Sequence, residues 1–344
     1  MTEAQAPVKM SDIAREAGVS VATVSRVVNG HYGVSAKTLE HVRAAIDELG
    51  YESSLVATSL RRSRTNVLGL VAHSFEAYTF EVLKGVMEAL SGTGLDLIIY
   101  ANSDTYGSHS DGWEKLHVNR LAGSLTDGCI IVTPWSEVKS TAPLVAIDPV
   151  RDSTIPSVRA DNFSGAVAAV DHLLELGHER IGFIAGRRSL AAAWAREEGY
   201  REALTRAGIP VDPTLIGGGD FHPEAVIAPA RELLASADRP TAIFAASDGM
   251  ALKVLEVARE LGLDVPRDLS IVGFDNVPES SLADPALTTI DQSMHRLGFE
   301  AARLLQALVS GTADESRQVI VPTRLIVRDS TSPPRGGSDQ PPGH

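Results

Sequence analysis

Apolar residues recur along this chain with two different periods. Between residues 10 and 50 they lie three or four positions apart, which is the spacing of one face of a helix. From residue 67 onward, short apolar runs of strand length alternate with longer stretches of helical periodicity. The first pattern predicts a small all-α domain. The second predicts parallel sheets that carry helices on both faces.

Three helices are expected in the N-terminal segment, because their ends carry recognisable signals. Ser11 is expected to cap the first helix, and Gly18 is expected to end it with a positive φ. Ser20 is expected to cap a second helix after a Gly-Val turn. The third helix should run from Ser35 to Gly50. This arrangement is typical of a helix-turn-helix.

The polar side of the second helix suits a DNA groove. Its hydroxyls and amide can contact phosphates, its guanidinium can contact guanine or phosphate, and its small side chains let bases approach. The residues expected on this face are Ser20, Val21, Ala22, Thr23, Ser25, Arg26 and Asn29. The alternative is a three-helix module that only packs.

The second pattern predicts two βα arrays of Rossmann-like topology with a cleft at the carboxyl ends of their strands, where open α/β sheets bind ligands. The expected divisions are a disordered N-terminus (1–9), a helix-turn-helix domain (10–51), a hinge helix or linker (52–64), a core (65–330) and a disordered tail (331–344). Within the core, the first subdomain is expected at 65–160 plus 290–317, and the second at 161–289 plus 318–330.

The net charge of −13 at first argues against a nucleic-acid partner, but its distribution does not. Residues 1–64 hold eight Lys and Arg against seven Asp and Glu, so the remaining residues carry −14. Arg61, Arg62 and Arg64 cluster beside the predicted DNA-reading unit. DNA binding should therefore rely on specific contacts and on symmetry.

Several function classes lack their sequence signals. The single cysteine, Cys129, lies in an apolar run and is expected to be a buried structural thiol. Neither a secretory signal nor a membrane span is present, which predicts a cytoplasmic protein without a membrane partner. Hydrolase, nucleotide-binding and metalloprotease motifs are absent, and the histidines lack metal-ligand spacing. We expect no cofactor and no metal, and we expect binding rather than catalysis.

The chain resembles the lactose-repressor (LacI) family of bacterial transcription regulators over about residues 10 to 330. The matching runs are DIA (12–14), AGVS (17–20), TVSRVVN (23–29), VS (34–35), LGY (49–51), LGHERIGFIAG, ELGLDVPRDLSIVGFDN and PALTTIDQ. The resemblance implies a periplasmic-binding-protein-like core. It also implies a homodimer that binds palindromic operator DNA.

The resemblance further implies a hinge that becomes helical on operator DNA. Leu60 matches the leucine that enters the minor groove, Ala57 would pack beneath it, and Arg61 would hold the phosphate backbone. A disordered linker is the alternative. The family often has Pro-Asn or Pro-Ser where this chain has Ser53 and Ser54.

In the cleft, the resemblance implies a small-molecule effector held by polar groups at strand ends and by aromatic rings. The matching positions are Asp148, Asp275, Gln292 and Phe221, and Phe75 and Tyr78 could add to the apolar wall. Carboxylates and an amide can each hold two hydroxyl groups of a sugar or glycoside.

Two positions in the cleft depart from the family pattern. Trp194 stands where an effector-clamping arginine is common, Arg196 lies two residues further on, and Ser247 replaces a common asparagine. An indole favours stacking over hydrogen bonding, so Trp194 and Phe221 are expected to stack on the ligand. The alternative is that Arg196 serves as the clamp.

Together these features predict a transcription regulator, most often a repressor in this family, whose operator affinity depends on a carbohydrate effector. A small-molecule solute-binding protein is the main alternative. A sugar-modifying enzyme with an appended DNA-binding domain is a third, although no catalytic constellation supports it.

Overall fold

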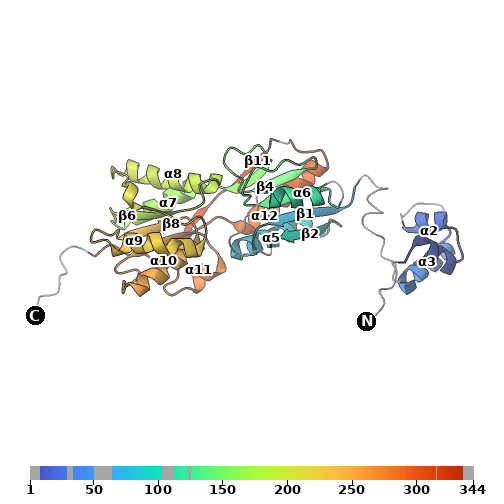
Figure 1. The fold of residues 1–344 in the computed structure, drawn as a ribbon, viewed down its shortest axis with the longest axis horizontal. Coiled ribbons are helices and arrows are strands. Elements are labelled where there is room, and N and C mark those ends of the chain that lie inside the picture. The colour runs from blue at the N-terminus through green and yellow to red at the C-terminus, as the bar shows by residue number, and fades with distance from the viewer. Residues whose placement is uncertain are drawn as a thin grey trace, which may run out of the picture. The chain divides into compact units, whose positions relative to one another are not determined.

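The structure is a computed structural model, and it describes residues 8–28, 34–49, 64–102, 112–122, 125–314 and 316–335. The chain divides into two compact units, Met1–Thr65 and Asn66–His344, which are described separately (Figure 1). None of the described helices is long and apolar enough to cross a membrane.

The first unit contains the three expected helices: α1 (Met10–Glu16), α2 (Val21–Val28) and α3 (Ala36–Leu49). Their apolar faces meet in one core. The buried residues of this core are Ile13, Ala14, Val24, Val42 and Ala45. The helical spacing of these positions is the pattern that predicted the domain.

The ends of the first two helices confirm two predictions and correct a third. Gly18 has a φ of +65°, and the Ser20 hydroxyl accepts a hydrogen bond from the Thr23 N–H at 3.1 Å. Ser11, however, lies inside α1. The helix begins at Met10, two residues earlier than a cap at Ser11 implies, because the Asp12 carboxylate accepts the Lys9 N–H at 2.9 Å and so fixes the first turn.

The expected disordered N-terminus also needs correction. Val8 packs against the core of the first unit, and Lys9 caps α1. Residues 8 and 9 are therefore part of the helical unit, and residues 1–7 lie outside the described residues.

The second unit contains two six-stranded sheets. The first sheet is parallel throughout, with the order β11 (Gln318–Val321), β5 (Ser157–Ala160), β4 (Leu144–Ile147), β3 (Gly128–Val132), β1 (Val67–Ala72) and β2 (Asp96–Ala101). The second sheet has the order β12 (Arg324–Ile326), β10 (Thr288–Asp291), β9 (Ser270–Asp275), β8 (Ala242–Ala245), β6 (Ile181–Ala185) and β7 (Ile216–Gly218). Only β12 is antiparallel to its neighbour.

Helices cover both faces of each sheet, as the apolar strands require. Leu70 of β1 faces a core shared with α5 (Ala77–Leu90) and α12 (Met294–Val309). Val71 faces the opposite core, which contains α6 (Trp113–Leu121) and the fully buried Cys129. The second sheet lies between α7 (Asn162–Glu175) and α8 (Ala191–Arg206) on one side and α9 (Ile227–Ala235) and α10 (Asp248–Glu260) on the other (Figure 1). The short helices are η1 (Pro213–Leu215), η2 (Pro223–Val226) and α11 (Pro278–Leu282).

The chain crosses between the two sheets after β5, after β10 and between β11 and β12. This corrects two expected boundaries. Residues 290 and 291 belong to the second sheet, because β10 continues to Asp291 beside β9. Residues 318–321 belong to the first sheet, because Val319 pairs with Val158 of β5.

The first part of the expected disordered tail is bound to the second sheet. Ser332 donates its N–H to the Ser270 hydroxyl at 3.0 Å, and its carbonyl lies 2.9 Å from His178 Nε2. Arg335 pairs with Asp268 at 2.7 Å. Residues 331–335 are therefore part of the fold, whereas 336–344 lie outside the described residues.

Two glycines let α5 and α12 approach closely in the first subdomain. A Cβ atom on Gly298 would lie 1.9 Å from the Val82 carbonyl oxygen, and one on Gly85 would lie 1.7 Å from the His295 carbonyl oxygen. These contacts are with backbone atoms, so the helices themselves would have to separate to admit a larger residue.

We therefore expect Gly298→Ala to lower the free energy of unfolding by about 2 kcal/mol or more, although alanine alone favours a helix by about 1 kcal/mol. Gly218→Ala is the control, because nothing lies within 4 Å of its Cβ position, and it should change stability by less than about 0.5 kcal/mol. Urea unfolding of the two variants measures this. Equal stability of the two variants would contradict the packing argument.

Candidate functional site

The outer face of α2 presents a narrow strip of small and polar side chains. Ser20, Val21, Ala22 and Arg26 are exposed. The hydroxyls of Ser20 and Thr23 are hydrogen-bonded to each other at 2.9 Å. Thr23 and Ser25 are half-buried. Arg26 is therefore the cation that this helix offers to a groove.

Four of the expected DNA contacts lie outside the described residues: Asn29, Ala57, Leu60 and Arg61. Their roles stay predictions.

A cavity of about 620 Å³ lies between the two sheets of the second unit. Several of its lining residues directly follow parallel strands: His73 follows β1, Thr133 follows β3 and Asp148 follows β4. On the other sheet, Asp275 ends β9 and Gln292 follows β10. The carboxyl ends of both sheets therefore meet at this cleft, as predicted for an open α/β fold.

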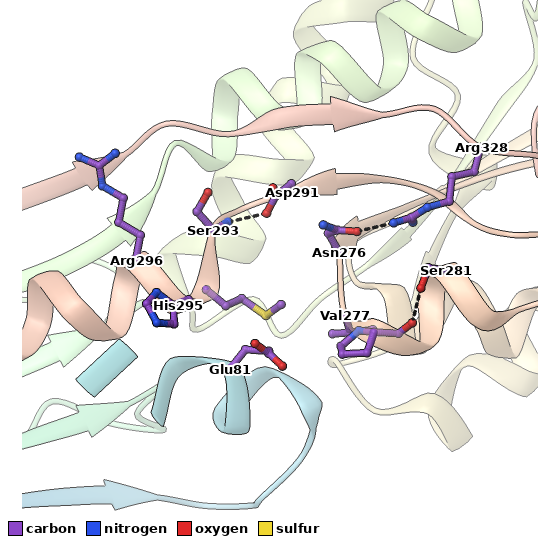
Figure 2. Close-up of a pocket in the computed structure, with 11 residues that line it drawn as sticks. Glu81, Asn276, Val277, Ser281, Asp291, Ser293, His295, Arg296 and Arg328 are labelled. Carbon is purple, nitrogen blue, oxygen red and sulfur yellow. Dashed lines mark hydrogen bonds between the residues drawn. The ribbon is translucent and has the colours of Figure 1, made fainter. Parts of the chain in front are cut away.

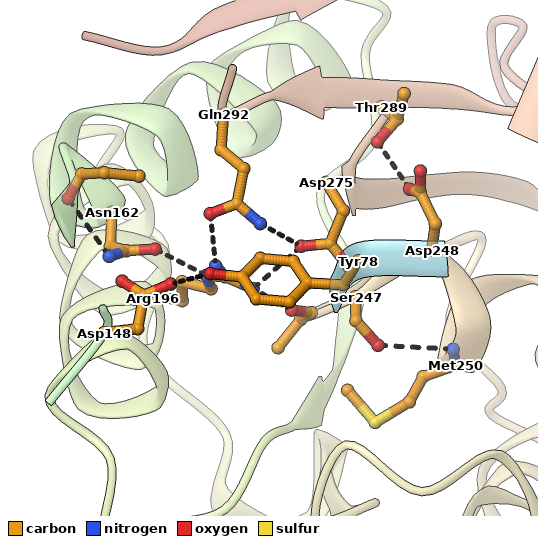
Figure 3. Close-up of polar contacts among 12 residues, drawn as sticks. Tyr78, Asp148, Asn162, Arg196, Ser247, Asp248, Met250, Asp275, Thr289 and Gln292 are labelled. Carbon is orange, nitrogen blue, oxygen red and sulfur yellow. Dashed lines mark hydrogen bonds and ion pairs between the residues drawn. The ribbon is translucent and has the colours of Figure 1, made fainter. Parts of the chain in front are cut away.

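Arg196 of α8 lies at the centre of the polar groups in the cleft (Figure 3). Its side chain is 3% exposed and lies over the Phe274 ring at 3.7 Å. Nε donates to Asn162 Oδ1 at 2.8 Å, Nη2 donates to Gln292 Oε1 at 3.3 Å, and Nη1 donates to the Ala246 carbonyl. Nη1 also lies 3.5 Å from Asp275 Oδ1. Arg196 therefore links the strand ends of the second sheet.

Two buried carboxyl groups flank this arginine. Burial raises the pKa of Asp275 well above its ordinary value, and Arg196 opposes the shift. Burial likewise raises the pKa of Asp148, again against the field of Arg196. Asp148 Oδ2 accepts a hydrogen bond from the Tyr78 hydroxyl at 2.6 Å. Its Oδ1 is buried and has no hydrogen-bond partner among the described residues. That atom is available to a donor on a ligand.

Of four further predicted residues, three line the cavity and one lies outside its lining. Tyr78, Phe221 and Ser247 line the cavity, and the Ser247 hydroxyl also caps α10 by accepting the Met250 N–H at 3.3 Å. Phe75 packs against Phe80, with ring centroids 5.4 Å apart, and is not among the cavity-lining residues.

Trp194 does not lie where the sequence analysis expected it. Its side chain is 45% exposed, lies under Arg151 at 4.7 Å and is not part of the described cavity lining. Positions two apart on a helix point about 200° apart, so burying Arg196 in the cleft turns Trp194 away from it. Arg196, which the alternative expectation names as the effector clamp, does line the cleft, and its role as a clamp stays a prediction.

Many cavity-lining residues were not predicted from the sequence, and His73, Trp135 and Arg187 are among them. The rule that found Asp148 and Asp275 also applies to these residues. His73 follows β1, Trp135 lies in the loop after β3, and Arg187 lies in the loop after β6. The available signal was position in the chain. Any side chain that follows a strand is a candidate for the cleft, whether or not it matches the family pattern.

A second, more open hollow of about 500 Å³ lies where α5, α11 and α12 come together (Figure 2). Arg328 donates to the Asn276 side chain at 2.7 Å and to the Leu287 carbonyl at 2.7 Å. Asp291 accepts the Ser293 N–H at 2.8 Å. The Asp291 contact lies where the chain crosses after β10, and the Arg328 contacts join the ends of β9 and β12 to the start of β10.

Comparison with known proteins identifies the family. Residues 9–54 match the model described as "Bacterial regulatory proteins, lacI family", and residues 170–331 match a "Periplasmic binding protein-like domain". Catabolite control protein A of Priestia megaterium is 35% identical over 334 residues, which cover 94% of this chain and 99% of that protein. This chain belongs to the LacI family.

Solved structures of LacI-family proteins agree with both units. A CelR–cellobiose complex has a TM-score of 0.71 at 34% identity, with coverage of 94% of this chain and 99% of that chain. A lac repressor dimer bound to operator and an anti-inducer has a TM-score of 0.82 at 30% identity, with coverage of 95% and 100%. The chain is therefore a DNA-binding transcription regulator with the family's ligand-binding core.

A third buried carboxyl group, that of Asp248, fixes the backbone next to the cleft of this LacI-family protein. Asp248, the first residue of α10, accepts hydrogen bonds from the Thr289 hydroxyl and from the Val277 N–H, the latter at 3.0 Å. Burial raises its pKa from 3.8 to about 6, although these hydrogen bonds oppose the shift. The folded protein therefore holds this proton more tightly than the unfolded chain does.

This shift predicts that the Asp248 contribution to stability is largest below about pH 4 and falls as pH rises to about 6. Relative to Asp248→Asn, the wild type should lose about 2 kcal/mol of unfolding free energy between pH 4 and pH 7. Urea unfolding at several pH values measures the difference, and Asp152→Asn controls for the loss of one charge at an exposed site. The raised pKa would be contradicted if the difference in unfolding free energy between wild type and Asp248→Asn stayed constant, or changed in favour of the wild type, as the pH rises.

Proposed function

We propose that this regulator is a repressor whose effector is a sugar or glycoside bound in the cleft between the two sheets. It binds the effector without turnover and acts as a cytoplasmic homodimer on palindromic DNA. The observation that carries the proposal is the set of cleft side chains, in which buried carboxyl groups surround one buried arginine. A polyol supplies the hydroxyl donors and acceptors that such a set requires.

Asp148 offers the sharpest support for a hydroxyl-bearing ligand. Its Oδ1 is buried without a hydrogen-bond partner among the described residues, and a buried acceptor without a donor costs about 1–3 kcal/mol. A ligand hydroxyl at this position removes that cost. We assign effector contacts to Tyr78, Asp148, Arg196, Phe221, Ser247, Asp275 and Gln292.

Of the two aromatic residues expected to stack on the ligand, Phe221 lines the site and Trp194 does not. Phe221 lines the cleft, and a Cβ atom on Gly186 would lie 2.2 Å from its ring, so the ring is held firmly in place. Relatives support the ligand class, because one solved LacI-family structure is a complex of CelR with cellobiose.

The contacts of Arg196 suggest how the effector signal leaves the cleft. Asn162 lies at the first crossing between the sheets, and Gln292 lies at the second. An effector that changes the contacts of Arg196 also changes the hydrogen bonds of Asn162 and Gln292 at these crossings. The angle between the subdomains changes as a result. We propose that this angle controls the pairing of the two DNA-binding units in the homodimer.

The proposed function is tested by fluorescence anisotropy on a palindrome upstream of the protein's own gene, with and without sugars. At least one sugar should change operator affinity by about 5-fold or more, which is the usual lower range of allosteric coupling. Arg196→Lys should keep operator binding and lose the response, because lysine lacks the planar fork of donors. Operator binding that no sugar alters would contradict the proposal.

On the DNA side, Arg26→Ala is expected to weaken operator binding by about 10-fold or more, and to weaken binding to unrelated DNA much less. The physical reason is that a base-contacting guanidinium discriminates sequence, whereas a phosphate contact does not. Arg43→Ala is the matched control, because this arginine is exposed on α3 instead of α2. Equal losses on both DNAs would make Arg26 a phosphate contact only.

A further inference from the structure

One end of the cleft carries an aromatic platform that the effector contacts assigned above leave unused. Trp135 lines the cavity from the first subdomain, and its side chain remains 38% exposed. His73, also a cavity residue, meets this ring edge-on at a centroid distance of 5.6 Å. A flat, partly exposed indole in a polar cavity is a surface on which a ring can stack.

The backbone beneath Trp135 is fixed by a buried carboxylate. Glu114 of α6 is 4% exposed and accepts the N–H groups of Trp135 at 2.7 Å and of Ser136 at 3.3 Å. The same carboxylate lies 2.7 Å from His73 Nε2. Glu114 therefore positions both aromatic groups, so the platform is preorganised.

Arg187 of the second subdomain covers this platform. Its guanidinium lies 3.7 Å from the centroid of the Trp135 ring, and Nη2 donates to the carbonyls of Thr133 at 3.3 Å and Pro134 at 3.1 Å. Its Nε is buried without a hydrogen-bond partner among the described residues. Burial lowers the pKa of Arg187 to about 10, against the fields of Glu114 and Asp220. A planar, polar group thus occupies the stacking face and carries an unused donor.

The size of the cavity leaves room for a ligand longer than one sugar ring. A hexose has about a dozen non-hydrogen atoms and fills at most about 360 Å³, even if each atom takes the roughly 30 Å³ of a liquid water molecule. The cavity measures about 620 Å³. One ring bound at Arg196 would therefore leave space that extends to Trp135.

We infer that Trp135 forms a second ring subsite, so that the effector is a disaccharide or longer saccharide. The inner ring binds at Asp148, Asp275 and Arg196, and the outer ring stacks on Trp135. Arg187 withdraws from the ring face and donates to hydroxyl groups of the outer sugar. The inference rests on the proposed sugar effector and adds the number of rings and the residue that selects for them.

Titration calorimetry on the full chain tests this with glucose, galactose, cellobiose, maltose, lactose and sucrose. At least one disaccharide should bind about 10-fold tighter than its component monosaccharides, as expected for one stacked ring. Trp135→Ala should reduce this preference to about 3-fold or less and leave monosaccharide affinity unchanged. Trp135→Phe should retain most of the preference, because it keeps an aromatic face.

Trp194→Ala is the matched control, because it removes an exposed tryptophan outside the cavity lining and should alter neither affinity. Operator binding by each variant reports that it is folded. Monosaccharides that bind as tightly as every disaccharide, or a Trp135→Ala variant that weakens both classes equally, would overturn the second subsite and leave the sugar effector standing. If an aryl glucoside binds as tightly as the best disaccharide, the group that stacks on Trp135 is an aromatic aglycone, and the assignment of a second sugar ring is wrong. Failure of all six sugars to bind would instead overturn the proposed function, and the subsite with it.

Discussion

A single buried guanidinium organises the ligand-binding core of this LacI-family regulator. Removing a charged group from water costs several kcal/mol, and Arg196 recovers this through hydrogen bonds to the Asn162 and Gln292 side chains and to the Ala246 carbonyl, together with its ion pair to Asp275. The same network leaves one Asp148 oxygen unpaired among the described residues. The polar floor of the cleft is thus held rigid while one acceptor stays available, which is the arrangement a hydroxyl-bearing ligand needs.

The position of this network explains why a small ligand affects a large part of the molecule. Asn162 and Gln292 stand at two of the three crossings between the sheets, and Thr323 at the third donates to the Asp161 carbonyl at 3.3 Å. The first crossing is therefore linked to the second through Arg196 and to the third through Thr323. Two sheets joined only by such segments can change their angle with little change inside either core, because each core is closely packed and moves as a rigid body.

The sequence predicted the parts of this molecule that depend on local pattern. Helical spacing between residues 10 and 50 predicted one small helical core, and the family pattern placed Asp148 and Asp275 in one cleft. The pattern could not assign β11 to the first sheet, because β11 and β12 are both short strands, one on each side of the last crossing. Only the strands with which they pair distinguish them. Nor could it place Trp194, since matching a family position does not reveal which helix face turns inward. The contact of Arg187 with Trp135 joins two subdomains, and no local signal reports it.

Thermodynamic linkage gives the most direct test of the claim that the cleft controls DNA affinity. Calorimetry of the effector sugar on the free protein and on its operator complex should yield two different affinities. Their ratio should equal the factor by which saturating sugar changes operator affinity, because coupling between two binding sites is reciprocal. Identical sugar affinities in the free and operator-bound protein would contradict the account, because the cleft and the DNA-binding unit would then be energetically independent.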